Sequence, residues 1–186
     1  MIKDLTFVTG NKGKLKQFKD YLRFPIKHAH LNLDEIQSMD LEKIVEHKLI
    51  QGYNQVRQPV LVDDASLNIE ALNGFPGPFF KWLLDAIGLE GICSLMKNYT
   101  NKNISGVVLI GFFDGKKKKI FKGKVKGQVA DVPKGDRGID WDRIFIPKGY
   151  NLTRAQMNDE DFKKTGPRKM ALEKLAKYLN KYSSIN

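Results

Sequence analysis

Two adjacent acids, Asp63 and Asp64, are the residues of this chain best suited to chemistry. They follow residues 60–62 (VLV), a short apolar run that is typical of a buried strand. Neighbouring carboxylates at the end of a strand are costly unless a metal ion, a proton or a positive group lies nearby. The pattern therefore indicates one wall of a functional site, although an acidic turn beside a core helix would explain the same residues.

The segment after the acids adds a bend and a basic aromatic run. Residues 74–78 (GFPGP) predict a rigid turn, and residues 79–82 (FFKW) place Lys81 among three aromatic side chains. A strand, an acidic tip, a bend and an aromatic face with a lysine are together consistent with a site for an anion.

A second candidate site lies near the start of the chain. Residues 5–8 predict a strand, and the loop Thr9–Lys14 connects it to a helix whose apolar residues have helical spacing. Backbone N–H groups and the helix dipole favour an anion at such a helix start, and Lys12 and Lys14 add positive charge. The spacing is not that of a Walker loop, so this motif alone permits a phosphate site without requiring one.

Alternating strand and helix patterns must position these residues. Helices are expected near residues 15–22, after a cap at Asp40, at 83–96 with a break at Gly88, and from about residue 165. Strands are expected near residues 28–30, 107–113 and 120–125, the last two joined by a turn at 114–115. No linker or repeat interrupts this order, so we expect a single domain over residues 1–186.

Composition limits the function classes. The chain has 186 residues, 41% of them hydrophobic, and a net charge of +11, so an anionic partner such as a nucleotide, nucleic acid or acidic membrane is plausible. A single cysteine, Cys93, excludes an internal disulfide and a cysteine-built zinc site. No signal peptide or membrane-spanning run is recognisable, and we expect a cytoplasmic protein. The lysine-rich strand at 116–126 suits a solvated edge better than a nucleic-acid surface, because no aromatic platform accompanies it.

Five motifs, in order along nearly the whole chain, resemble those of the inosine triphosphate pyrophosphatase family. They are Thr9-Gly10-Asn11-x-x-Lys14, Asp63-Asp64, residues 71–78 (ALNGFPGP) with Lys81-Trp82, residues 141–149 (WDRIFIPKG) with Thr153-x-Ala155-x-Met157, and Arg168-x-x-Ala171-Leu172. The resemblance implies an α/β fold with a long curved mixed sheet flanked by helices, two lobes and a central active-site cleft. It also implies a homodimer and Mg²⁺-dependent hydrolysis of purine nucleoside triphosphates to the monophosphate and pyrophosphate.

The resemblance also assigns roles to residues. Asp64 would be the general base and a metal ligand, with Glu35 as a second ligand and Asp63 as a supporting acid or a third ligand. The expected contacts to phosphates and substrate are Thr9, Gly10, Asn11, Lys12, Gly13, Lys14, Lys48, Ala65 and Lys81. The expected contacts to the base are Ile139, Asp140, Trp141, Asp142, Pro167 and Arg168.

Departures from the family pattern gather in the segments that would contact the base. They are Ala65-Ser66 after the acidic pair, Ile139-Asp140 before Trp141, Phe162 in place of a lysine, and Gly166-Pro167 before Arg168. These changes predict altered base selectivity in an enzyme that keeps its phosphate chemistry. Two alternatives are a catalytically weak nucleotide-binding relative and a basic nucleic-acid-binding protein.

Overall fold

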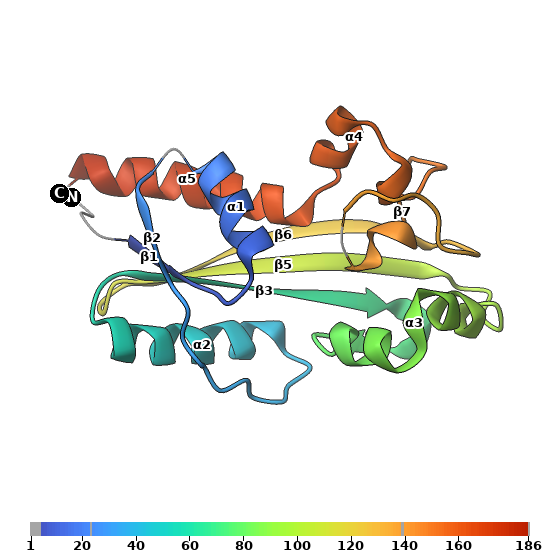
Figure 1. Ribbon diagram of the computed structural model, residues 1–186, viewed down its shortest axis with the longest axis horizontal. Helices are drawn as coiled ribbons and strands as arrows, with labels where there is room; N and C mark the ends of the chain where they lie inside the picture. Colours follow the sequence, from blue (N-terminus) through green and yellow to red (C-terminus); the bar gives the residue numbers. More distant parts are fainter. Residues whose placement is uncertain (1–4, 23, 139, 186) are drawn as a thin grey trace. The chain divides into compact units, whose positions relative to one another are not determined.

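A computed structural model describes residues 5–22, 24–138 and 140–185 (Figure 1). Its strands are β1 (Leu5–Val8), β2 (Ile26–Ala29), β3 (Val60–Ile69), β4 (Pro76–Gly77), β5 (Asn103–Phe113), β6 (Lys118–Val129) and β7 (Phe145–Pro147). Its α-helices are α1 (Lys12–Tyr21), α2 (Leu41–Val56), α3 (Phe80–Met96), α4 (Asp159–Lys164) and α5 (Pro167–Ile185). Short 3₁₀ helices are η1 (Glu70–Leu72), η2 (Asp140–Arg143) and η3 (Arg154–Gln156).

Within the described residues, the strands form one mixed sheet. Its order is β2-β1-β3-β5-β6-β7, and β4 pairs with β3. Strand β1 is parallel to β2 and β3, whereas β4 runs antiparallel to β3 and β7 antiparallel to β6. The expected α/β fold, with helices flanking a mixed sheet, is confirmed.

The chain divides into two compact units. Unit 1 consists of Met1–Asp64, Val108–Gly123 and Arg168–Asn186, and unit 2 of Ala65–Val107 and Lys124–Pro167. Strands β3, β5 and β6 contribute residues to both units. The single-domain organisation and the central cleft stay predictions.

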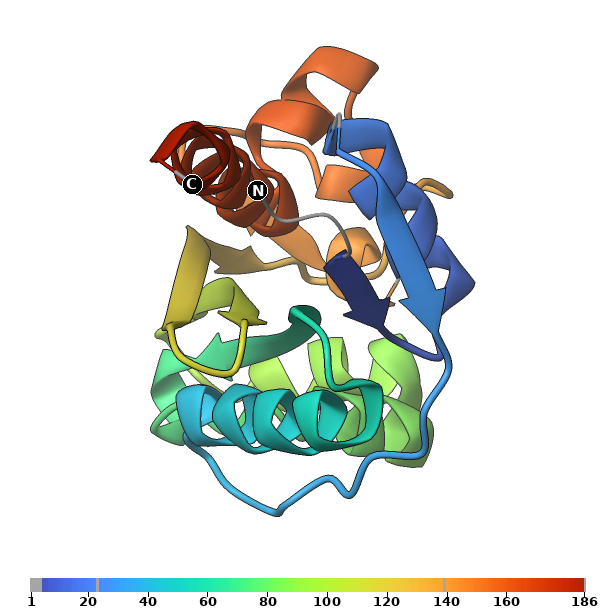
Figure 2. The same ribbon diagram turned by 90° about the vertical axis from the view of Figure 1, so that its left-hand side faces the viewer.

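In unit 1, helices α2 and α5 cover opposite faces of the sheet (Figures 1 and 2). Gly111 of β5 lies directly against α2, because a Cβ built there would stand only 2.6 Å from Leu49 Cδ1. The next side chain, Phe112, points to the other face, as successive side chains of a strand do. Its ring meets that of Tyr178 in α5 with centroids 5.6 Å apart.

Helix α2 forms where the sequence predicts it. The Asp40 side chain caps the helix by accepting hydrogen bonds from the backbone N–H groups of Glu42 and Lys43. The apolar stripe of the helix is buried and consists of Leu41, Ile44, Val45 and Leu49. Burial of such side chains stabilises a fold by about 1.5–3 kcal/mol each, so this stripe fixes the rotation of α2. Lys48 lies off the stripe and is thereby directed to the candidate site.

Unit 2 is built around α3 and the segment that carries Trp141. Helix α3 is kinked at Gly88, whose φ of 67° suits glycine, as the sequence predicts. The Trp141 ring packs edge-on against Phe80, with centroids 5.3 Å apart. Gly106 of β5 leaves room for this indole, since a Cβ built there would lie 3.6 Å from Trp141 Cζ2.

The strand that carries the acids is longer than the sequence predicts. Strand β3 runs from Val60 to Ile69, so Asp63 and Asp64 lie inside a strand and the expected strand end is wrong. Successive side chains point to opposite faces, and each acid meets its own basic partners. These partners offset the cost of removing the carboxylates from water, so the strand can continue past them.

Candidate active site

Asp63 is the most deeply buried acid of unit 1, with no exposed side-chain surface. Arg168 Nε donates to Asp63 Oδ2 at 2.7 Å, and Lys14 Nζ lies 2.6 Å from Oδ1 in an ion pair without hydrogen-bond geometry. Burial alone would raise the pKa of Asp63, but Arg168 and Lys14 outweigh it and lower the pKa to about 2. Asp63 is therefore an ionised anchor for two cations.

Asp64 belongs to a second, more open group of charges. Lys48 Nζ donates to Asp64 Oδ2 at 2.7 Å and to Glu35 Oε1 at 2.5 Å. Glu35 comes from the loop before α2 and has 72% of its side chain exposed, whereas Lys48 has only 12% exposed. Burial lowers the pKa of Lys48, but Asp64 and Glu35 more than compensate, and the pKa lies above its ordinary value. One ammonium thus holds two carboxylates together.

The two carboxylates of this group suit a divalent cation. Because Glu35 and Asp64 both reach the same ammonium, both can reach one cation in its place. Within the described ranges, no cluster of three or more His, Cys, Asp or Glu side chains is placed to hold a metal. Mg²⁺ does not need one, since it commonly binds through one or two carboxylates, several waters and the phosphates of its substrate.

Residues 9–14 comprise the short loop after β1 and the first residues of α1, which begins at Lys12. Asn11 caps the helix by accepting a hydrogen bond from Lys14 N at 3.0 Å, and Thr9 Oγ1 accepts from Asn11 N at 3.1 Å. His28 of β2 adds a contact that the sequence did not predict, between its Nε2 and the carbonyl oxygen of Thr9 at 2.8 Å. The loop is thus shaped by its own side chains. Its remaining members, Gly10, Lys12 and Gly13, are exposed.

Two residues that are predicted to contact the substrate pair with protein side chains in the structure. Arg168, expected at the base, lies at the start of α5 in unit 1, where Nη1 also donates to Gln17 Oε1 at 3.2 Å. Lys81, expected at a phosphate, belongs to unit 2 and pairs with Asp85 on an exposed face of α3. The ligand contacts of both residues stay predictions.

In unit 2, a buried ion pair supports the segment that carries Trp141 and Asp142. Arg154 Nε donates to Asp142 Oδ1 at 2.6 Å, and Arg154 Nη1 donates to Thr165 Oγ1 at 2.6 Å. The guanidinium also lies over the Phe162 ring, 4.3 Å from its centroid. Arg154 is not among the residues that the sequence analysis assigns to the site. It directly follows Thr153, which forms a capping box with Gln156 at the start of η3.

The other predicted residues are placed as follows. Ala65 is half-buried in β3, and Pro167 is buried at the first position of α5. Asp140 begins η2. Ile139 lies outside the described residues.

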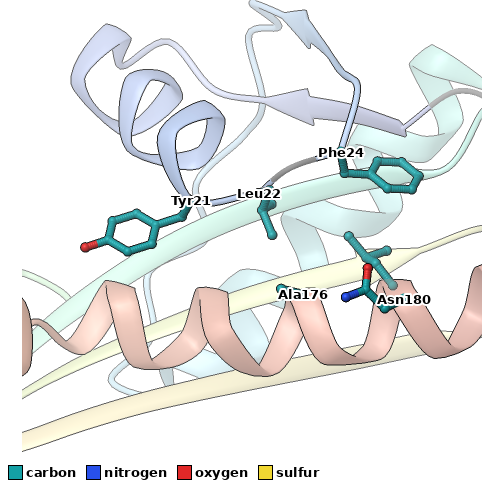
Figure 3. Close-up of a pocket in the computed structure, with 6 residues that line it drawn as sticks. Tyr21, Leu22, Phe24, Ala176 and Asn180 are labelled. Atoms are coloured by element: carbon teal, nitrogen blue, oxygen red, sulfur yellow. The ribbon is translucent and has the colours of Figure 1, made fainter.

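Unit 1 also contains a small hollow that involves none of the predicted site residues. It has a volume of 170 Å³ and is lined by Tyr21, Leu22, Phe24, Ala176, Leu179 and Asn180. Figure 3 shows that the end of α1 and the chain after it face α5 here. Its lining combines apolar side chains with the polar groups of Tyr21 and Asn180 and includes no acid, histidine or lysine.

Comparisons with known proteins identify the family. Residues 5–178 match the sequence model of the Ham1 family, and the chain belongs to this family. Over 92% of its length it is 38% identical to a protein of Methanopyrus kandleri named dITP/XTP pyrophosphatase, of which 94% is covered. It is 36% identical to the inosine triphosphate pyrophosphatase of Schizosaccharomyces pombe, over 96% of each chain. The family resemblance expected from the five motifs is confirmed.

Solved structures support the fold. The Ham1 protein of Staphylococcus aureus superposes with a TM-score of 0.86 at 24% identity, covering 97% of this chain and all of the other. A HAM1 protein from Coxiella burnetii gives a TM-score of 0.83 over 96% of this chain and 98% of its own. Among the helices of the described residues, none has the length and apolar character to cross a membrane.

Proposed function

We propose that this protein hydrolyses purine nucleoside triphosphates such as ITP, dITP and XTP to the monophosphate and pyrophosphate, with Mg²⁺ as its cofactor. The observation that carries the proposal is the pair of carboxylates, Glu35 and Asp64, held within 2.7 Å of one ammonium in unit 1. The names of the relatives from Methanopyrus kandleri and Schizosaccharomyces pombe support the same substrate class.

In this proposal the residues of unit 1 bind the triphosphate and activate water. Asp64 accepts a proton from the water that attacks the α-phosphorus, a new P–O bond forms, and the α–β bridging bond breaks to release pyrophosphate. Lys14 and Lys48 stabilise the charge that develops on the phosphate oxygens, and the exposed residues 10–13 at the start of α1 contribute backbone N–H groups. Mg²⁺, held by Glu35 and Asp64, would neutralise phosphate charge.

We further propose that base selectivity differs from that of typical relatives. The supporting observation is that the departures Ile139, Asp140 and Phe162 surround the segment of Trp141 and Asp142 in the sequence. Phe162 itself is packed against the Arg154 guanidinium in unit 2, an arrangement that a lysine at this position could not make. Relaxed discrimination among purine triphosphates is the expected consequence.

A substrate screen tests both parts of the proposal. Pure folded protein with Mg²⁺ is offered ITP, dITP, XTP and the four common nucleoside triphosphates, and pyrophosphate release is measured. Release from ITP, dITP or XTP supports the reaction, and a flat profile over the purines supports relaxed selectivity. Binding of these nucleotides by calorimetry without any release would instead indicate the catalytically weak relative.

A further inference from the structure

Lys48 is shared by the two carboxylates that we assign to the metal. Its ammonium lies 2.5 Å from Glu35 Oε1 and 2.7 Å from Asp64 Oδ2, and its side chain is only 12% exposed. A divalent cation that binds both carboxylates must therefore displace this ammonium. The other lysine of the site, Lys14, pairs with Asp63 and does not stand in the way.

We propose that Lys48 makes metal binding depend on the nucleotide. The ammonium competes with the metal for Glu35 and Asp64 until the phosphate oxygens of a bound triphosphate accept it. This inference rests on the proposed function and adds a condition on binding: the metal binds tightly only together with the nucleotide. Lys48 is then a coupling residue as well as a phosphate contact.

Electrostatics and side-chain chemistry support the competition. Two positive charges cannot share a partly buried pair of carboxylates without strong repulsion, so the metal alone must push the ammonium away from the two carboxylates to which it donates hydrogen bonds. A lysine has a flexible four-carbon stem and three donors, so it can turn to a phosphate without moving the backbone of α2. The triphosphate thus removes the competitor and supplies further metal ligands.

Thermodynamic linkage makes this coupling reciprocal. If the nucleotide strengthens metal binding by a given factor, the metal strengthens nucleotide binding by the same factor. Removing the Lys48 ammonium should reduce this factor, because the metal would no longer need the nucleotide to free its ligands. Nucleotide-free metal affinity should rise as the coupling falls.

The decisive measurement is the affinity for Mn²⁺ in the absence of nucleotide, followed by electron paramagnetic resonance. Mn²⁺ serves as the probe for the Mg²⁺ site. We expect Lys48→Met to bind Mn²⁺ more tightly than the unmodified protein by a factor on the order of 5 to 150, the usual range of such couplings. Lys48→Gln provides a second uncharged variant, and Lys48→Arg keeps the charge and should keep the weak affinity.

Two controls separate the possible causes of a change in Mn²⁺ affinity. Lys43→Met removes an exposed lysine from the same helix and should leave Mn²⁺ affinity unchanged, which excludes a general charge effect. Unchanged or weaker Mn²⁺ binding in both Lys48→Met and Lys48→Gln would overturn the competition, even if the protein hydrolyses ITP. If Asp64→Asn does not impair the Mn²⁺ binding of Lys48→Met, the assigned metal site itself is wrong and the inference fails with it.

Discussion

Two groups of ion pairs, one chosen from each unit, differ in how exposed they are. In unit 1, Lys48 joins Asp64, which is 21% exposed, to Glu35, which is 72% exposed. In unit 2, Arg154 and Asp142 have only 6% and 9% of their side chains exposed. An open pair can exchange a partner for a ligand at little cost, whereas breaking a closed pair leaves a buried charge without compensation. This difference supports the proposal that the first group binds ligands, whereas the second stabilises the fold.

The sharpest test of the open group is Asp64→Asn. Asparagine cannot accept the proton of the attacking water, so pyrophosphate release should fall by about 100- to 10,000-fold, the usual contribution of a general base. Pyrophosphate release from ITP in the presence of Mg²⁺ measures the effect. Asp20→Asn changes an exposed acid of the same unit, which pairs with Lys16 at the surface, and should keep full activity. Equal activity in the two variants would remove Asp64 from the chemistry.

The closed pair should matter for stability. Arg154→Met leaves the Asp142 carboxylate buried without its cation and removes the donor to Thr165, so the free energy of unfolding should fall by about 3–5 kcal/mol. Denaturant unfolding gives this value. The matched control is Lys164→Met, which breaks an exposed pair with Glu160 in the same unit and should lower the free energy of unfolding far less. A loss as small as that of the control would contradict the role of Arg154 as a structural support.

Local patterns in the sequence were sufficient to predict most elements. The cap at Asp40, the break at Gly88 and the turn at 114–115 depend on residues within a few positions of each other, and all three are found in the structure. The extent of β3 depends on distant residues instead. Arg168, 105 positions away, compensates Asp63, and no periodicity reports such a contact.

The candidate site, too, could be predicted from the sequence only in part. Asp64, Glu35 and Lys48 were named from the family pattern, and the structure brings these three together. Arg154 was missed because a buried arginine contradicts the general preference of this residue for the surface. Its place follows only from the partners Asp142 and Thr165, which lie on other elements. Side-chain pairing across elements is the information that the sequence pattern lacks.

The contribution of the Asp63 ion pairs to the free energy of unfolding can be measured by varying the pH. Because its pKa in the folded protein is about 2, below the unfolded value of 3.8, its stabilising effect is complete above about pH 4. The effect is lost as the pH falls from there through about 2. Over this window the free energy of unfolding of the unmodified protein should fall by roughly 2 kcal/mol more than that of Asp63→Asn. Parallel curves for the two proteins in urea would show that the pairs with Lys14 and Arg168 contribute nothing.

Among these substitutions, Lys81→Met should have the smallest effect on stability and activity. It compares an exposed ion pair of unit 2 with the Lys48 group of unit 1. Its side chain is 80% exposed and its pair with Asp85 joins neighbouring turns of α3, so Lys81→Met should change the free energy of unfolding by less than about 1 kcal/mol. If Lys81 contacts a phosphate, as the family resemblance predicts, kcat/KM for ITP should still fall, by less than for Lys48→Met because an exposed charge is screened by solvent. Kinetics at low and high salt measure this loss, which should shrink as salt is added. Unchanged kcat/KM at both salt concentrations would confine the phosphate contacts to other residues and leave Lys81 as a surface charge of unit 2.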